Sequence, residues 1–492
     1  MTEQMIVPSG CSRRDFLRGS LLTAGALALN GYAAPKKNKS TKVVAPANPA
    51  AAQMFLAGIG CGGKGNGDIT EMMEAGMSLG ALCDVDDITL QKKAAEVRQK
   101  FPGVRLYHDY RELLEKEKGK IHAVTVSTPD HMHAPIVALA MRMGLHVYCQ
   151  KPLTHTIWEA RQLRELAKTS GVVTQMGNQG SASDELRRGV EVLQAGVLGP
   201  VREVHVWTNR PIWPQGVARP AGEDPVPPHL DWNLWLGIAP FRPFKDKYPE
   251  EIAPAKGKNA ERKGHVYHPF NWRGWHDFGT GALGDMACHA VNLPFRALDL
   301  GYATEVEAQV AGAMPESYPA HARVRFQYPQ RGTKPPVTLW WYEGGWLPPK
   351  ELVQDLVDLR AGMPHSGIYF VGEKGRFVST SDYGGSTFMR MNNEAKLRSV
   401  TKHEACLPIP VSLPRVGNHY REWVEACVAG NPKLPYSRFE IAAYLTEMVL
   451  MGCIALRLPG KKIAWDGPNM RSPNTPEVAP LVHGTYRDGW TV

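Results

Sequence analysis

Three polar residues, Lys151, Asp285 and His289, have the types and spacing needed for acid–base chemistry. Asp285 and His289 are four residues apart, so on a helix their side chains share one face. An imidazole, with an ordinary pKa near ~6.5, can take the proton of a hydroxyl group at neutral pH. An ammonium group can donate to the same oxygen and stabilise its developing charge. The set suits oxidation of a secondary alcohol, with His289 as base, Lys151 as its electrostatic partner, and Asp285 orienting the imidazole or holding a neighbouring hydroxyl.

A glycine-dense turn predicts a dinucleotide site upstream of these residues. After an expected strand, Met54–Ile59, residues 58–63 read GIGCGG, which fits G-x-G-x-x-G, and a helix follows to about Ala75. Such glycines allow a tight turn, a backbone that approaches pyrophosphate, and close packing of helix on strand. The next strand, Ser78–Val85, brings Asp84 to the place where a carboxylate accepts hydrogen bonds from an adenosine ribose. Since no Arg or Lys follows directly to receive a 2′-phosphate, NAD is favoured over NADP; a Rossmann-like domain with a vacant nucleotide site is the alternative.

Further strands and helices alternate through this half of the chain. The other expected strands are His122–Thr128, His146–Tyr148 and Val172–Gln175, and the expected helices between them are Ala134–Met143 and Ile157–Thr169. This alternation predicts a parallel sheet covered on both faces. Ligands bind at the carboxyl ends of the strands in such sheets, and Lys151 follows one of those ends.

Three segments carry a resemblance to a known family. Residues 127–133 read STPDHMH, residues 148–153 read YCQKPL and residues 284–289 read GDMACH. Together with the glycine turn they resemble the Gfo/Idh/MocA oxidoreductase family, which places T-P-x-x-x-H after the fourth strand, E-K-P after the fifth and D-x-x-x-H on a later helix. The resemblance runs from Met54 to the end of the chain.

The resemblance implies a set of site residues. It gives Lys151, Asp285 and His289 the family's catalytic roles. The implied cofactor-binding residues are Gly58, Ile59, Gly60, Cys61, Gly62, Gly63, Asp84, Thr128, Pro129, His133, Gln150, Lys151 and Asn178. Two positions depart from the family pattern: Gln150 replaces the glutamate that helps to position the lysine, and Asn292 stands where many members have Asp.

The second half of the chain has a different texture. The strand-like runs, in which Val, Phe, Trp and Tyr alternate with polar residues, are Arg202–Asn209, Glu305–Val310, Arg323–Tyr328, Pro336–Tyr342 and Ile368–Thr380. Two segments, His419–Val428 and Arg438–Leu456, are expected helices, and the second is apolar and predicted to return to the first domain. The fold class is therefore α/β: a Rossmann doubly wound parallel sheet over 53–178, then an α+β domain with a large, mostly antiparallel sheet over 179–492. The exposed face of that sheet is a candidate surface for a homo-oligomer.

Aromatic and polar residues cluster in the expected loops of this half, as in sugar-binding sites, where rings stack on C–H faces. The cluster also contains Tyr267 and Trp275, and for any one of its tryptophans a core position is the alternative. The candidate substrate-binding residues are Trp207, Arg210, Trp213, Trp272, Arg273 and His276. A metal is not predicted, because the spacing of His265, His268 and His276 matches no tight ligand pattern.

The first 33 residues are predicted to be a twin-arginine export signal. Arg13 and Arg14 precede the apolar run Leu21–Leu29, and Gly31 and Ala33 have the spacing of a cleavage site. This run is too short to cross a bilayer, and no later stretch was expected to cross one. Residues 34–52, rich in Pro, Ala and Lys, are predicted to be a flexible linker. The signal places the protein in the exported subgroup of the family, in the periplasm or elsewhere outside the cytoplasm.

Charge and cysteine content narrow the remaining partners. The formal charge is +9, but seven Lys/Arg and only two acidic residues lie in residues 1–50, so the rest is nearly balanced and nucleic acid is not expected to bind. The eight cysteines form no C-x-x-C pair, and Cys61, Cys83, Cys149 and Cys288 are expected to be small core residues.

Three functions remain open from the sequence. The first is an NAD-dependent oxidoreductase that acts on a secondary hydroxyl of a sugar, cyclitol or glycoside and holds its cofactor tightly. The second is redox-neutral, NAD-assisted glycoside hydrolysis or elimination. The third is a non-catalytic sugar-binding protein. Export favours a retained cofactor, because free NAD is scarce outside the cytoplasm.

Overall fold

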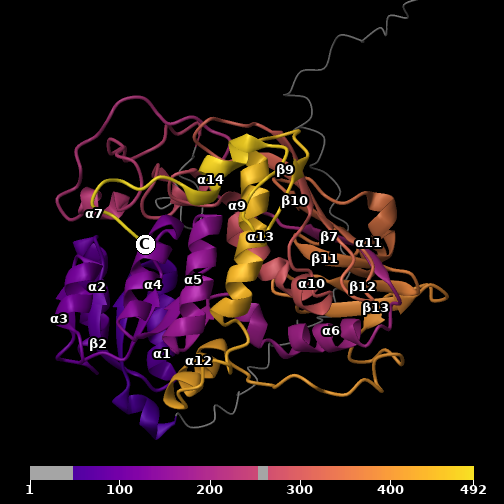
Figure 1. The fold of residues 1–492 in the computed structure, drawn as a ribbon, viewed down its shortest axis with the longest axis horizontal. Helices are drawn as coiled ribbons and strands as arrows, with labels where there is room; N and C mark the ends of the chain where they lie inside the picture. Colours follow the sequence, from indigo (N-terminus) through magenta and orange to yellow (C-terminus); the bar gives the residue numbers. More distant parts are fainter. Residues whose placement is uncertain (1–47, 253–263) are drawn as a thin grey trace, which may run out of the picture. The chain divides into compact units, whose positions relative to one another are not determined.

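The computed structural model describes residues 48–252 and 264–492 (Figure 1). The predicted signal and linker residues 34–47 lie outside this part of the chain. Residues Pro49–Gln53 form a short 3-10 helix, in which Ala51 is fully buried. Asn48 caps it, since its side chain accepts a hydrogen bond from the amide of Ala50. The folded part therefore begins ahead of Gln53, earlier than the sequence predicted.

A six-stranded parallel sheet forms the first layer, in the order β3-β2-β1-β4-β5-β6. Its strands are β1 (Phe55–Ile59), β2 (Ser78–Cys83), β3 (Arg105–Tyr107), β4 (Ala123–Val126), β5 (His146–Cys149) and β6 (Thr174–Met176). The strand order reverses between β1 and β4, as in a Rossmann fold, and a ligand crevice lies at such a switch point. Nearly all residues of β1, β2 and β4 are buried, as expected for a sheet covered on both faces.

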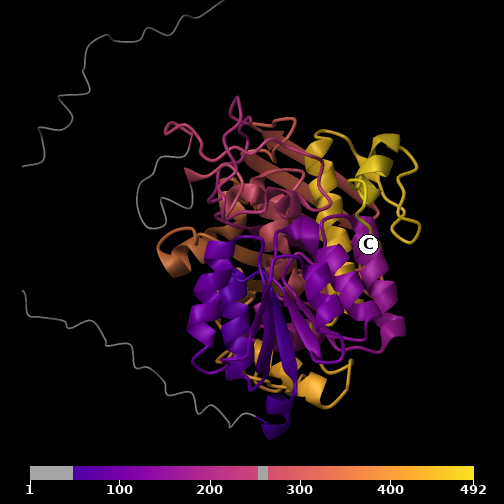
Figure 2. The same cartoon turned by 90° about the vertical axis from the view of Figure 1, so that its left-hand side faces the viewer.

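Helices cover both faces of this sheet (Figure 2). Two lie on one face, α1 (Gly63–Glu74) and α2 (Asp87–Val97), and three on the other, α3 (Tyr110–Lys116), α4 (His133–Arg142) and α5 (Ile157–Ser170). A helix from far along the chain, α12 (His419–Val428), joins the α1 side, where Trp423 packs edge-on against Tyr148 of β5 at 5.9 Å between ring centroids. The first layer therefore depends on residues from both ends of the chain.

The second sheet has nine strands in the order β14-β13-β12-β11-β7-β10-β9-β8-β15. Only the β7–β10 pair is parallel among its described pairs. The strands are β7 (Val201–Trp207), β8 (Glu305–Ala311), β9 (His321–Tyr328), β10 (Val337–Glu343), β11 (Gly367–Gly372), β12 (Gly375–Ser379), β13 (Thr387–Met391), β14 (Arg398–Ser399) and β15 (Ile463–Ala464). Helices pack beside it: α6 (Asp184–Gln194), α9 (Gly281–Ala290), α10 (Asn292–Ala297), α11 (Gln354–Arg360) and α13 (Phe439–Arg457). The expected fold class is the one observed.

The run Ile368–Thr380, which reads as one strand in the sequence, is a hairpin. Gly372 and Gly375 flank the turn, and β11 pairs antiparallel with β12 on either side of it. The turn consists of the charged pair Glu373 and Lys374 between the two glycines, and this short polar break marks the reversal.

A long connection between β7 and α9 crosses the carboxyl end of the first sheet. Its described parts, residues 208–252 and 264–280, contain α7 (Trp232–Leu236), and we call this connection the insert. The insert has its own aromatic core, in which the rings of Trp232 and Trp235 stack at 4.6 Å. The amide of Asp231 donates to the carbonyl of Val85 at 2.9 Å, directly after β2. The insert therefore forms a roof over the switch point.

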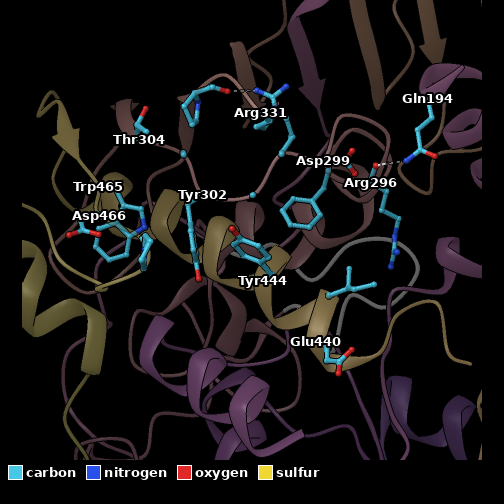
Figure 3. A pocket seen from close by; sticks show the side chains of 18 of the residues that line it. Gln194, Arg296, Asp299, Tyr302, Thr304, Arg331, Glu440, Tyr444, Trp465 and Asp466 are labelled. Atoms are coloured by element: carbon cyan, nitrogen blue, oxygen red, sulfur yellow. Dashed lines mark hydrogen bonds between the residues drawn. The ribbon is translucent and has the colours of Figure 1, made fainter. Parts of the chain in front are cut away.

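Helix α13 lies between the two sheets. Contrary to the expectation from the sequence, it is long and apolar enough to cross a membrane, but 83% of its apolar stretch is buried inside the fold, as in a core helix. A cavity of about 820 Å³ lies beside it, lined by Tyr302, Tyr444 and Arg296 among others (Figure 3). None of the predicted site residues lines this cavity.

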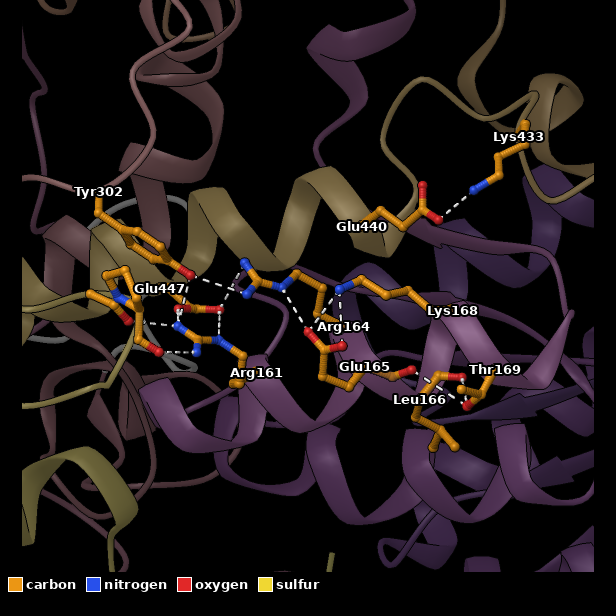
Figure 4. A network of polar contacts seen from close by, with 12 residues as sticks. Arg161, Arg164, Glu165, Leu166, Lys168, Thr169, Tyr302, Lys433, Glu440 and Glu447 are labelled. Carbon is orange, nitrogen blue, oxygen red and sulfur yellow. Dashed lines mark hydrogen bonds and ion pairs between the residues drawn. The ribbon is translucent and has the colours of Figure 1, made fainter. Parts of the chain in front are cut away.

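Ion pairs attach α13 to α5 of the first domain (Figure 4). The guanidinium of Arg161 donates to both carboxylate oxygens of Glu447, at 3.0 and 2.7 Å, and to the hydroxyl of Tyr302 at 2.7 Å. Arg164 approaches the same carboxylate at 3.3 Å. Glu447 is buried, and these partners satisfy its carboxylate oxygens.

We expect Glu447→Ala to lower the free energy of unfolding by about 2–3 kcal/mol, because two partly buried guanidinium groups lose their carboxylate. The matched control is Glu440→Ala, about two turns earlier on α13, where the carboxylate pairs with the exposed Lys433 (Figure 4). An exposed pair contributes about 0–1 kcal/mol. Urea unfolding of both variants measures the difference, and equal midpoints would contradict the assigned role of Glu447.

Candidate active site

A cavity of about 860 Å³ runs from the glycine turn to α9. Its size falls within the range of small-molecule and cofactor sites. The predicted residues that line it are Ile59, Gly60, Cys61, Gly62, Gly63, Asp84, Thr128, Pro129, His133, Gln150, Lys151, Arg210, Trp213, Trp272, Arg273, Asp285 and His289. One cavity thus joins the predicted cofactor, catalytic and substrate groups.

The glycine turn has the shape that a pyrophosphate requires. Gly60 has φ +82°, and a Cβ there would lie 2.7 Å from the carbonyl oxygen of Ser127. Gly62 offers α1 no side-chain cap, so the first-turn amides of this helix suit an anion. The close approach of helix to turn falls at Gly65, where a Cβ would lie 1.9 Å from the carbonyl oxygen of Gly60, and not at Gly63, which has open space. The sequence motif located the turn but assigned the packing glycine two residues early.

Asp84 joins the end of β2 to this turn. One carboxylate oxygen accepts a hydrogen bond from the amide of Cys61 at 2.7 Å, and the other from the amide of Asp86 at 3.0 Å. Burial raises the pKa of Asp84, while the two amides act to lower it. The carboxylate therefore lies at the edge of the cavity, beside the predicted pyrophosphate site, where a ribose is expected.

We expect Asp84→Ala to weaken NAD binding by about 1.5–3 kcal/mol, the contribution of a hydrogen bond to a charged group. Isothermal titration calorimetry measures it. Asp84→Asn is the control. Its side-chain oxygen can still accept the hydrogen bond from the Cys61 amide, so a loss of affinity in this variant measures the contribution of the negative charge. NAD binding by Asp84→Ala as tight as in the parent, or a preference for NADP, would contradict this assignment.

Asp86 fastens the insert over the cavity. Its carboxylate contacts Nε2 of His268 at 2.9 Å and Nδ1 of His229 at 3.0 Å, and it also caps α2. Burial acts to raise the pKa of Asp86, but the hydrogen bond and charge of His268 outweigh it and lower the pKa to about 2. Local sequence patterns could not predict these contacts, because both histidines lie more than 140 residues from Asp86.

Lys151 and Asp285 form a partly buried ion pair at the other end of the cavity. The Nζ of Lys151 donates to the carboxylate of Asp285 at 2.7 Å and to its main-chain oxygen at 2.8 Å. The Nε of Arg273 lies 3.4 Å from the same carboxylate oxygen. Burial acts to raise the pKa of Asp285, but Lys151 and Arg273 hold it well below its ordinary value. Asp285 is therefore ionised and orients both cations.

His289 lies on the next turn of α9 and is buried. Burial, and then the charge of Lys151, hold the pKa of His289 well below its ordinary value, so the imidazole is neutral at neutral pH. Its Nδ1 has no hydrogen-bond partner among the described residues. Tyr383 packs edge-on against the ring at 4.7 Å and fixes its plane. A neutral imidazole beside an ammonium group suits removal of a hydroxyl proton.

Gln150 has a partner that explains the departure from the family's glutamate. Its Nε2 donates to the carboxylate of Asp68 at 2.8 Å, which also accepts from the hydroxyls of Ser127 and Tyr420, each at 2.9 Å, and pairs with Lys64. Asp68 is fully buried, and a glutamate at position 150 would place a second carboxylate against it. Asp68 thus supplies the negative charge that position 150 lacks. In the sequence, only its spacing of four residues from Lys64 hints at this.

Asp130 is a buried carboxyl within the 127–133 segment, and the sequence did not predict it as a site residue. It lines the cavity, and the hydroxyl of Thr280 donates to it at 2.7 Å. Burial raises the pKa of Asp130 to about 7, although Thr280 and the charge of Lys151 oppose the shift. A carboxyl that titrates near neutral pH can give or take a proton during turnover.

Several predicted site residues lie elsewhere. Trp207, the last residue of β7, is fully buried against α11, and its indole donates to the carbonyl of Pro364 at 2.9 Å. His276 is buried against Tyr318. Both predictions as substrate contacts need correction, because these side chains belong to packing layers. Asn178 donates to the carbonyl of Cys288 at 3.2 Å and pairs with Ser437, so it joins the two domains and does not face the cavity.

Other predicted residues have structural roles. Gly58 lies beneath the turn, where a Cβ would meet Ile69. The side chain of Asn292 donates a hydrogen bond to the hydroxyl of Ser181 and accepts one from the guanidinium of Arg296. Tyr267 and Trp275 belong to the core of the insert.

Within the described ranges no group of three His, Cys, Asp or Glu side chains could hold a metal ion. His265 and His268 each pair with a different carboxylate, those of Asp246 and Asp86. The described cysteines, which include Cys61, Cys83, Cys149 and Cys288, are buried and unpaired.

The sequence is similar to those of known oxidoreductases and glycosidases. Residues 56–178 match the model of the Gfo/Idh/MocA oxidoreductase family, described as an NAD-binding Rossmann fold. An uncharacterized oxidoreductase of Schizosaccharomyces pombe is 32% identical over 107 residues, which are 22% of this chain and 28% of that one. An alpha-N-acetylgalactosaminidase of Shewanella oneidensis is 30% identical over 202 residues, which are 38% of this chain and 43% of that one. The chain thus spans less than half the length of these curated relatives.

A solved structure shares the fold over most of the chain. It is an inositol dehydrogenase homolog from Azotobacter vinelandii, complexed with NADH and myo-inositol, with a TM-score of 0.56 and 19% identity over 85% of this chain and 99% of that one. At this identity the likeness concerns the fold. The glycine turn, the switch point and the family match lead to one conclusion: residues 56–178 form an NAD-binding Rossmann domain of the kind that the Gfo/Idh/MocA oxidoreductase family carries.

Proposed function

We propose that this protein is an NAD-dependent oxidoreductase that acts on a secondary hydroxyl of a sugar, cyclitol or glycoside and keeps its cofactor bound between turnovers. The observation that carries the proposal is the single cavity that joins the glycine turn to Lys151, Asp285 and His289. An arrangement with a binding function alone would leave the Lys151–Asp285 pair and the neutral His289 without use.

Different residues of the cavity bind the cofactor and carry out the proton transfer. The turn at 58–63 and Asp84 hold the dinucleotide, which supplies a hydride acceptor when bound. His289 takes the hydroxyl proton, and Lys151 donates a hydrogen bond to the same oxygen and stabilises its charge. Asp285 holds Lys151 at 2.7 Å and so positions it.

The substrate end of the cavity fits a polyol. Trp213, Trp272 and Arg273 line it, and the guanidinium of Arg273 lies 4.2 Å from the ring centroid of Trp272. Aromatic faces bind C–H surfaces of sugars while charged groups bind hydroxyls. The solved relative with myo-inositol bound is consistent with this class of substrate.

A second candidate is NAD-assisted glycoside hydrolysis, in which the cofactor ends each cycle in its starting state. The similarity to the alpha-N-acetylgalactosaminidase of Shewanella oneidensis favours it. Asp130, with its pKa raised to about 7, adds a proton donor that simple alcohol oxidation does not need.

Nucleotide analysis of the purified protein tests both candidates. Denatured protein should release close to one NAD(H) per chain that resisted dialysis, which requires nanomolar affinity or about −12 kcal/mol. Adding a sugar substrate to the undenatured protein should change the nicotinamide absorbance near ~340 nm in a single turnover if the reaction is a net oxidation. Release of a free sugar with no lasting absorbance change would favour hydrolysis. Protein recovered without nucleotide, with micromolar affinity and turnover only on added NAD, would contradict cofactor retention.

We also propose that the protein is exported as a folded holoprotein. Arg13 and Arg14 support this, and the roof that the insert forms over the cofactor cavity fits a cofactor carried through export. Fractionation of cells that produce the full chain, followed by nucleotide analysis of each fraction, tests it.

A further inference from the structure

The end of the chain reaches the cofactor cavity. Residues 484–492 leave α14 (Ala479–His483), pass over the insert beside α7 and end above the carboxyl edge of the first sheet (Figure 1). We call residues 484–492 the terminal segment. Among its residues, Trp490 lines the same 860 Å³ cavity as the glycine turn and Asp84.

Arg487 attaches the terminal segment to the insert. Its amide donates to the carbonyl of Ile238 at 3.0 Å, and its guanidinium donates to the side chain and the carbonyl of Asn233, both at 2.9 Å. Three hydrogen bonds therefore fix the segment to the roof of the cavity.

Trp490 attaches the same segment to the first domain. The guanidinium carbon of Arg111 lies 4.4 Å from the ring centroid of Trp490, within the range of a cation–π contact, and the ring of Tyr110 lies 6.5 Å away. Asp109 holds Arg111 through hydrogen bonds of 3.0 and 2.6 Å. The segment therefore bridges the insert and the start of α3.

The position of Trp490 along the cavity identifies which part of the dinucleotide it meets. The pyrophosphate site lies at the end of β1, and Asp84 at the end of β2 marks the adenosine ribose. Tyr110 follows β3, which is the next strand outward in the sheet. The base attached to that ribose therefore lies toward β3, where Tyr110, Asp109 and Trp490 line the cavity.

We propose that the terminal segment is part of the cofactor site: Trp490 forms a wall of the adenine pocket, and the attachment through Arg487 slows release of the dinucleotide. This inference rests on the proposed function, since it takes NAD as the ligand. It adds a binding element that lies far outside the Rossmann domain in sequence.

A purely structural role makes a different prediction. The same end of the chain also contacts α5, where the hydroxyl of Tyr486 donates to Glu159 at 2.7 Å. If Trp490 only stabilised the fold, its removal would lower the melting temperature and affect both halves of the cofactor alike. An adenine wall affects only the adenosine half.

Binding of two fragments to the full chain separates these roles. ADP-ribose carries the adenosine half and nicotinamide mononucleotide the other half. Trp490→Ala should weaken ADP-ribose binding by about 10- to 100-fold, the range for loss of one base–aromatic contact, and leave binding of nicotinamide mononucleotide unchanged. Trp490→Phe should recover most of the affinity. Trp346→Ala, at a half-buried tryptophan of the second domain, is the matched control and should change neither.

Release of bound NADH tests the attachment. Arg487→Ala should speed dissociation of NADH at least as much as it lowers affinity, because the segment loses its bonds to Asn233. Unchanged ADP-ribose binding and NADH release in both Trp490→Ala and Arg487→Ala would overturn the inference, as would an equal loss for both fragments. A parent protein that binds neither ADP-ribose nor NAD would instead overturn the proposed function, and this inference with it.

Discussion

His289→Ala should lower kcat by about 10²–10⁴-fold, the contribution of positioned acid–base catalysis, and leave NAD binding nearly unchanged. The physical reason is the separation of the two functions along one cavity. His289 lies on α9, whereas the nucleotide groups lie on the glycine turn and at the end of β2. Removal of the imidazole takes away the neutral base that α9 presents to the cavity.

Single-turnover rates with bound cofactor measure this effect without interference from NAD binding. His276→Ala is the matched control: it removes another buried imidazole, thirteen residues earlier, which the structure places outside the cavity. We expect this variant to keep its kcat. Full activity of His289→Ala, or an equal loss in both variants, would remove His289 from the role of base.

Lys151→Met should lower kcat by about 10²–10³-fold, the effect of losing one donor to a developing oxyanion. It should also change the pH dependence. The charge of Lys151 lowers the pKa of His289. Without that charge the pKa of His289 rises, and since the neutral imidazole is the active form, the acid limb of the kcat/KM profile moves to higher pH.

The pH profile separates this role from a structural one. Lys151→Arg keeps the positive charge beside Asp285 but changes its reach, so its rate should fall while the acid limb stays close to that of the parent. A Lys151→Met protein with an unshifted acid limb would show that Lys151 acts on geometry alone. Unchanged kcat would exclude it from the mechanism.

The sequence predicted those elements and residue positions that depend only on neighbouring residues in the chain. The strand–turn–helix at residues 54–75 follows from glycine spacing and apolar runs, and the shared face of Asp285 and His289 follows from their spacing of four residues. Lys151 was placed correctly at a strand end because ligand sites in parallel sheets lie there.

Contacts between distant segments could not be predicted in this way. Trp207 and His276 have the composition of a sugar site, but neighbouring β-strands and the insert bury them. From the sequence alone, Gln150 is a glutamate position that has lost its charge. The structure shows that the carboxylate of Asp68, 82 residues earlier in the chain, contacts it. The sequence shows which side chains are aromatic or charged, but not which segment folds over them.

Helix α12 and residues 49–53 cover the α1 side of the first sheet, and this arrangement affects the order in which the domain can fold during synthesis. Residues 53–178 look like a complete domain, yet the α1 side of their sheet is closed by Tyr420 and Trp423. During synthesis this apolar face stays open to water until more than 240 further residues have emerged from the ribosome. A ribosome-released fragment that ends near residue 178 should therefore aggregate or bind chaperones. We therefore expect the nucleotide to bind this domain only after α12 has been synthesised.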